Sequence, residues 1–167
     1  LSPGCYDAVA CHSGDVGFEM MFQPTFGETL THVAAHGTAA DYVRHVQHAA
    51  KLSGPDFHTL MICAMAASYD ARDPTSDNPL GIELPVEPRT GKIIERAWDN
   101  WLANDPLEMI ETHSDGLQSL AALWIDCGDR DQYNIQYGSR AFIDKLSQIG
   151  IDHSWEEFSG THSGIDH

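Results

Sequence analysis

Basic residues are scarce in this chain of 167 amino acids, which has 9 lysines and arginines against 25 aspartates and glutamates. The formal net charge of −16 repels phosphate backbones and anionic lipid surfaces, so we expect neither nucleic acid nor a membrane as a partner. No run of 18 apolar residues occurs, so no membrane-spanning helix is expected. Repeats and low-complexity tracts are also lacking, and the length predicts one globular unit.

Cysteine is rare and scattered. The four cysteines are single residues, which predicts free, buried thiols rather than a disulfide framework or a metal site; they are Cys5, Cys11, Cys63 and Cys127. The first residues lack an initiator methionine, a basic segment and an apolar segment, so no export signal is visible. These features favour a cytoplasmic protein.

The last third of the chain carries the strongest structural pattern. Ser119–Asp126 is a nearly continuous apolar run of strand length, which predicts a strand covered on both faces, and a loop of glycine and charged residues follows it up to Asp131. Residues 133–150 predict a helix with one apolar face, formed by Ile135, Phe142, Leu146 and Ile149. His153–Phe158 predicts a further strand, after which comes a loop that contains His162.

A strand, a crossover helix and a parallel strand place the two following loops at the same edge of the sheet. In open α/β sheets this edge is where ligands bind. Asp131 and His162 are therefore the predicted catalytic residues.

The first two thirds of the chain predict one strand and then helices. Tyr6–His12 is strand-like and ends at the turn Ser13-Gly14-Asp15. Four helices are expected, at Phe26–His36, Ala39–Lys51, Phe57–Tyr69 and Lys92–Ala103. The third would bury one face, made of Phe57, Leu60, Met61, Ala64 and Met65. Residues 70–89 predict a long loop, and Asp105 with Pro106 predicts the start of another helix.

The predicted fold class is therefore α/β, with parallel strands, a helical insertion at about residues 26–110, and a core at 118–167 that carries Asp131 and His162. Only three strands can be counted, whereas a doubly wound sheet usually has ~5 to 6. The motif G-x-S-x-G, which carries the nucleophilic serine upstream of the acid on this fold, is absent. The chain is therefore expected to correspond to the carboxyl half of a larger enzyme.

Several segments resemble one family. They are Ala10–Asp15 with Phe18-Glu19, Gly54–His58, Trp98–Pro106, and above all Ile125–Asn134 with Glu156–Phe158 and His162. Together they are similar to the esterase family of α/β-hydrolases that includes enterochelin esterase and S-formylglutathione hydrolase. The resemblance implies a serine hydrolase that cleaves carboxylic esters or thioesters without a cofactor. It also implies that the acid is Asp131, three residues after Gly128, and that the base is His162.

In this family the nucleophile precedes the strand that matches Tyr6–His12, so the resemblance implies that the serine lies outside this chain. Asp131 would orient His162, which would shuttle the proton of the serine. Alternatives remain for both residues, since Asp131 could close a turn with Arg130 and His162 could be a solvated loop residue. Three serines could replace the absent nucleophile, with Ser13 the best placed, followed by Ser163 and Ser114.

Two other functions are open at this stage. His32 and His36 are four residues apart, and His45 and His48 three apart, which is a spacing found in metal-dependent hydrolases, although a histidine-bearing helix surface explains it too. The chain could instead be an inactive interaction module. Its strand Tyr6–His12 would then be an unpaired edge that forms a homo-oligomer or binds the absent amino-terminal half.

The helical insertion is expected to cap the active site, as the resemblance implies. Its aromatic and methionine side chains would suit the wall of an apolar pocket or the core of the insertion, and they are Phe57, Met61, Met65, Trp98 and Trp101.

Overall fold

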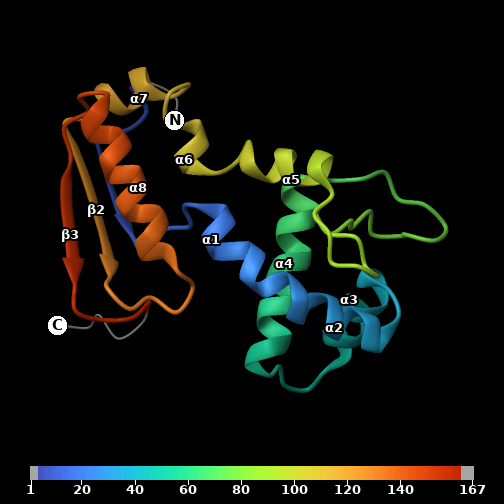
Figure 1. Cartoon of the computed structure of the whole chain (residues 1–167). Helices are drawn as coiled ribbons and strands as arrows, with labels where there is room; N and C mark the ends of the chain where they lie inside the picture. The colour runs from blue at the N-terminus through green and yellow to red at the C-terminus, as the bar shows by residue number, and fades with distance from the viewer. Residues whose placement is uncertain (1–3, 163–167) are drawn as a thin grey trace. The chain divides into compact units, whose positions relative to one another are not determined.

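A parallel sheet of three strands forms one part of the molecule. The computed structural model describes residues 4–162, and there β1 (Ala8–His12), β2 (Ala122–Gly128) and β3 (Ser154–Phe158) lie in the order β1-β2-β3. Both pairings are parallel, with Ala10 opposite Trp124 and Trp124 opposite Ser154 (Figure 1). This confirms the predicted mixed α/β class and the three strands. The carboxyl ends of the strands consequently share one edge.

One face of the sheet is covered by α8 (Ile135–Gln148), which connects β2 to β3. Its Leu146 is fully buried in a core cluster with Leu123 and Ile125 of β2. Phe142 and Ile149 pack against the same cluster. The predicted inner face of this helix is thus confirmed.

The other face of the sheet is uncovered within residues 4–162, so the prediction of a strand covered on both faces is wrong. Trp124 is 40% exposed, whereas its neighbours Leu123 and Ile125 are buried. Strand side chains alternate between faces, and the apolar Ala122 and Trp124 hid this alternation in the sequence. On this face the Asp126 carboxylate accepts a hydrogen bond from Trp124 Nε1 at 2.8 Å and contacts His12 Nδ1 at 2.6 Å.

The chain divides into two compact units, a sheet unit (Leu1–Met21 with Asp105–His167) and a helical unit (Phe22–Asn104). The helical unit overlaps the insertion predicted at about residues 26–110. It contains the 3-10 turn Gln23–Thr25, α2 (Phe26–His36), α3 (Ala39–His48), α4 (Gly54–Tyr69) and α5 (Glu95–Leu102). Two short helices of the sheet unit, α6 (Pro106–Met109) and α7 (Ser114–Gln118), precede β2, and α1 (Phe18–Phe22) leads from β1 into the helical unit.

Capping explains where the helices begin. The Thr38 side chain accepts from the Asp41 backbone while the Asp41 carboxylate accepts from the Thr38 backbone, and Ser53 and Asp56 repeat this reciprocal arrangement. Because Ser53 is the cap, α4 begins at Gly54, three residues before the predicted Phe57. The other predicted helices are confirmed with small shifts at their ends.

The buried face of α4 is the opposite of the predicted one. Thr59, Ile62, Cys63 and Ala66 are buried, whereas Phe57 is 56% exposed. The helix is apolar on nearly all sides, so apolar spacing alone does not identify its inner face.

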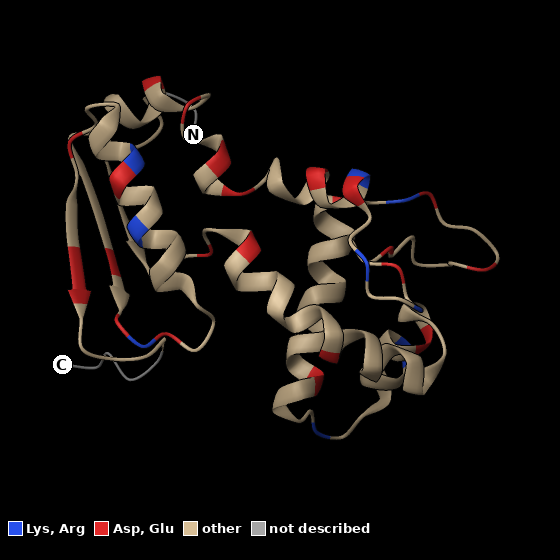
Figure 2. Cartoon of the chain, in the orientation of Figure 1, with Lys and Arg blue, Asp and Glu red and all other residues tan. Residues whose placement is uncertain are grey.

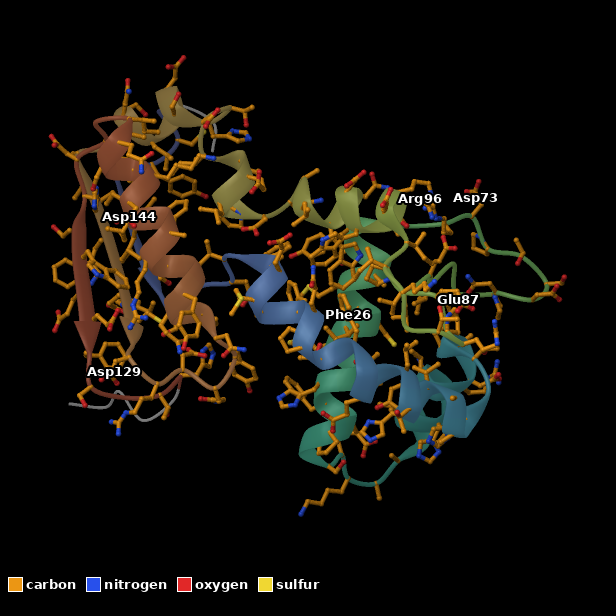
Figure 3. All side chains as sticks on the ribbon, in the orientation of Figure 1. Phe26, Asp73, Glu87, Arg96, Asp129 and Asp144 are labelled. Atoms are coloured by element: carbon orange, nitrogen blue, oxygen red, sulfur yellow. The ribbon has the colours of Figure 1, made fainter. Side chains whose placement is uncertain are left out.

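Aromatic rings form the core of the helical unit. Trp101 is fully buried, and its ring meets those of Phe22 and Phe26 edge to face, with centroids 5.3 and 5.9 Å apart. Trp98 packs against Phe26 at 5.7 Å. Figure 3 shows Phe26 in the helical unit. Of the two roles open for Trp98 and Trp101, the structure places both in the core.

The loop after α4 is held by a buried carboxylate. The Asp70 side chain is 2% exposed and accepts hydrogen bonds from Arg72 Nη2 and from Arg96 Nη1. Both arginines also bind Glu83. Figure 2 shows acidic residues spread over helices, strands and loops, in keeping with the 25 acidic residues of the chain.

Asp105 joins the two segments through which the chain leaves and rejoins the sheet unit. Its carboxylate is nearly inaccessible and accepts hydrogen bonds from the backbone N–H groups of Gly17 at 3.0 Å, Phe18 at 2.6 Å and Leu107 at 2.9 Å. The predicted cap of the helix at Pro106 is confirmed. Asp105 also binds two residues more than 80 positions earlier, a role that the local sequence did not predict.

The cysteines are free, as predicted, but only Cys63 and Cys127 are buried. Cys11 is half-buried and Cys5 is exposed, so the prediction of burial is wrong for Cys5. Between residues 4 and 162, no helix is both long enough and apolar enough to span a membrane.

Candidate active site

Asp131 lies in the loop that follows β2, with its side chain completely buried. Its Oδ1 accepts a hydrogen bond from the backbone N–H of Tyr133 at 2.8 Å. Its Oδ2 lies 2.9 Å from Nδ1 of His162. Arg130 instead contacts Asp129 and Ser159, so the alternative of a turn closed by Asp131 and Arg130 has no support.

His162 follows β3 and is the partner that the sheet topology predicts for Asp131. Its backbone N–H donates to Gln132 Oε1 at 3.2 Å, and its ring meets the Tyr133 ring edge to face at 4.9 Å. The side chain is 34% exposed. Since Nδ1 faces the buried carboxylate, Nε2 is the ring nitrogen through which His162 would exchange a proton with a substrate.

Backbone hydrogen bonds hold the two loops together. Asp129 N donates to Phe158 O and Arg130 N donates to Gly160 O, both at 2.9 Å, while Gly160 N donates to the Asp129 carboxylate at 3.0 Å. A Cβ at Gly128 would overlap the carbonyl oxygens of Gly160 and Thr161. The loops therefore approach each other as closely as a glycine allows, and this close approach brings His162 next to Asp131. Figure 3 shows Asp129 at this edge of the sheet.

Cys127, near the end of β2, contacts Asp131, and its Sγ lies 4.0 Å from Asp131 Oδ2. Burial, and then the negative charge of Asp131, raises the pKa of the Cys127 thiol. A thiol that stays protonated is a poor nucleophile, so Cys127 is a packing residue here.

Ser13 follows β1 at the same edge, in a left-handed backbone conformation with φ of 47°. Its backbone N–H donates to Asp126 O at 2.9 Å, and its hydroxyl is buried near the Cys127 thiol, whose pKa it lowers. A buried hydroxyl that does not contact His162 is not set up for attack. The Ser114 hydroxyl donates a hydrogen bond to Glu111 O at 3.0 Å, so it is not paired with His162 as a nucleophile would be. Ser163 lies outside the described residues.

The histidines proposed as metal ligands have other contacts. His32 Nδ1 lies 2.9 Å from the Thr59 hydroxyl, His48 Nδ1 lies 2.7 Å from the Arg44 carbonyl oxygen, and the rings of His36 and His45 stack at 4.2 Å. In the part of the chain that the structure describes, no group of three or more potential metal ligands comes together. A metal-dependent hydrolase gains no support from this arrangement.

Asp15 is a further acidic residue of this edge that sequence reasoning did not assign to the site. Burial raises the pKa of the Asp15 carboxyl, the negative charge of Asp131 adds to this effect, and the charge of His162 opposes it. Asp15 therefore lies within electrostatic reach of both predicted residues. Asp15 could have been found from its position two residues after Ser13, just past the carboxyl end of β1, because ligands bind at the carboxyl ends of all strands of such a sheet.

This raised pKa predicts how stability depends on pH. The folded state holds the Asp15 proton more tightly than the unfolded state does, so ionisation of Asp15 lowers the free energy of unfolding as the pH rises above the ordinary aspartate pKa of 3.8. We therefore expect Asp15→Asn to be more stable than the wild type at pH 7, with a smaller difference at pH 3. Urea unfolding at both pH values measures this, with Asp144→Asn on the exposed side of α8 as the control (Figure 3). A pH-independent difference for Asp15→Asn would contradict the assignment.

Gln132 and Tyr133 also belong to the site, because both contact His162, and neither was predicted from the sequence.

Comparison with known protein families and with curated proteins found no match for this chain.

Proposed function

We propose that this chain carries the acid and the base of an ester hydrolase with an α/β-hydrolase fold. The supporting observation is the 2.9 Å contact between His162 Nδ1 and a fully buried Asp131 carboxylate, with the His162 side chain one third exposed. A buried carboxylate favours the imidazolium that forms when Nε2 accepts a proton. The parallel order β1-β2-β3, with acid and base in the loops after β2 and β3, agrees with this fold.

In the proposed reaction a serine from outside this chain attacks the carbonyl carbon of a carboxylic ester or thioester. His162 Nε2 takes the serine proton and returns it to the leaving alcohol or thiol, and Asp131 holds the imidazole in the required tautomer. Without that serine, the same base activates a water molecule at a much lower rate.

Hydrolysis of p-nitrophenyl butyrate tests this function. We expect His162→Ala to lower the rate of the chain by about 10²-fold, which is the lower range for loss of a general base. The matched control is His12→Ala, since His12 also contacts an aspartate but lies on the uncovered face of the sheet with its side chain 59% exposed. Equal rates for the wild type and His162→Ala, or a larger loss for His12→Ala, would refute the proposal.

The source of the nucleophile is tested separately. We expect a fluorophosphonate probe to leave the 18.4 kDa chain unlabelled in an intact-mass measurement. A single adduct on this chain would mean that the serine lies within it, and peptide mapping would then distinguish Ser13 from Ser163.

A second candidate function is association through β1. Within residues 4–162 this strand pairs only with β2, so its other edge presents backbone donors and acceptors to a further strand. A homo-oligomer or a complex with an amino-terminal half would use this edge. Sedimentation equilibrium is expected to give a mass above 18.4 kDa, and a strict monomer across micromolar concentrations would contradict association of the chain with itself.

A further inference from the structure

The sheet unit contains an apolar cavity of about 240 Å³ beneath the sheet. Its floor is formed by side chains of β1 and β2, and Ile110 and Phe142 of the covering helical layer lie against it; the floor residues are Val9, Cys11, Leu123 and Ile125. Neither the acid nor the base of the proposed site lines this cavity. No role described so far accounts for it.

None of the residues that line the cavity is exposed, and several of the apolar ones are buried. Leu123 is 7% exposed, Ile125 5% and Ile110 1%. A surface that docks a protein segment would have exposed side chains, so the cavity suits a small, narrow ligand and not a helix or strand of another polypeptide.

The floor of the cavity is close to Asp131 along strand β2. Ile125 is part of the floor, and two residues farther along the same face of β2 lies Cys127, whose Sγ is 4.0 Å from Asp131 Oδ2. Two residues of a strand span about 7 Å. Asp15 also lines the cavity, and its carboxyl is within electrostatic reach of both Asp131 and His162.

We propose that this cavity binds the linear hydrocarbon chain of a substrate, so that the preferred esters are those of medium-chain acids, with about eight carbons. The identification of the substrate as an ester rests on the proposed function, whereas the binding of a hydrocarbon chain in the cavity does not. At about 30 Å³ for each small group, comparable with a water molecule, the volume holds on the order of eight methylene groups. Each buried methylene group is expected to strengthen binding about four-fold.

The probe is an unreactive neutral alcohol, because the carboxylates of Asp15 and Asp131 would repel a fatty acid anion. Isothermal titration calorimetry is expected to show saturable 1:1 binding of 1-octanol, about 200-fold tighter than that of 1-butanol, since four methylene groups separate them. Failure of 1-octanol to saturate, or equal affinities for the two alcohols, would overturn the proposal.

Two neighbouring residues of β1 provide a matched pair of variants. Cys11 lines the cavity, whereas Ala10 is exposed on the other face of the same strand. Cys11→Phe is expected to abolish octanol binding and Ala10→Phe to leave it unchanged. Should Cys11→Phe fail to fold, Val9→Ile adds one methyl group to the floor and is expected to weaken octanol binding several-fold. Octanol binding that neither floor variant affects would refute the assignment.

Chain-length preference separates this inference from the proposed function. If hydrolysis depends on His162, p-nitrophenyl octanoate is expected to have a higher kcat/KM than the butyrate, and Cys11→Phe or Val9→Ile to reduce this preference. His162-dependent hydrolysis without a length preference would overturn the cavity as the acyl site. Octanol binding without any hydrolysis would refute the proposed function and would still support the hydrocarbon ligand.

Discussion

Replacing Asp131 with asparagine is expected to lower kcat for ester hydrolysis by about 10⁴-fold when the serine is present, with little change in KM. The amide of asparagine would offer an N–H group where His162 Nδ1 now faces a carboxylate oxygen 2.9 Å away. The imidazole would then take the other tautomer or turn away, and its cation would lose the stabilising charge. Steady-state kinetics of the proposed ester hydrolysis measure the effect, and circular dichroism verifies the fold.

Asp129→Asn is the matched control for this variant. Asp129 lies in the same loop, its side chain is 38% exposed, and its Oδ1 accepts a hydrogen bond from Gly160 N that an asparagine oxygen can also accept. We expect Asp129→Asn to retain nearly full activity. Similar losses for the two variants would mean that Asp131 supports the loop and does not act on His162.

Gly138→Ala is expected to lower the free energy of unfolding by about 3 kcal/mol, at the upper end of the usual range for overpacking. Gly138 lies in α8, where a Cβ would overlap the carbonyl oxygen of Val16 and crowd the backbone of Gly17. Both obstacles are backbone, which cannot rotate away as a side chain can. The helix and the segment after β1 would have to separate. Urea denaturation followed by tryptophan fluorescence measures the loss.

Gly27→Ala provides the opposite prediction in another helix. Gly27 lies in α2, and a Cβ there would meet nothing within 4 Å. Alanine favours helix by up to about 1 kcal/mol over glycine, so this variant is expected to be as stable as the wild type or more stable. Destabilisation by both substitutions to the same extent would contradict the explanation based on close backbone approach.

Local chemistry in the sequence predicted much of this fold. Asp105 with Pro106 gave the start of α6, and the apolar face of residues 133–150 gave α8, because caps and helix periodicity act over a few residues. The pairing of Asp131 with His162 was also predictable, since parallel strands leave both following loops at one edge.

Features that depend on distant partners were not predictable. The inner face of α4 is set by what packs around it, and its sequence is apolar on nearly every side. Trp124 is exposed because no layer covers that face of the sheet within residues 4–162, and an apolar run in the sequence does not show how many faces of a strand are covered. The position of Asp15 beside the acid and base likewise follows from β1 pairing with a strand more than 100 residues later.

The contacts of Asp105 have a consequence for the order of folding. The Asp105 carboxylate binds Gly17 and Phe18, which lie 88 and 87 positions earlier in the chain, so these contacts close a long loop. The entropy lost in closing a flexible loop grows with its length. The helical unit brings its own ends together, since Phe22 and Trp101 meet edge to face. If this unit folds first, the effective loop shrinks to a few residues, and β1 can pair with β2 quickly. Substitutions at Trp101 are therefore expected to slow formation of a sheet to which this residue does not belong.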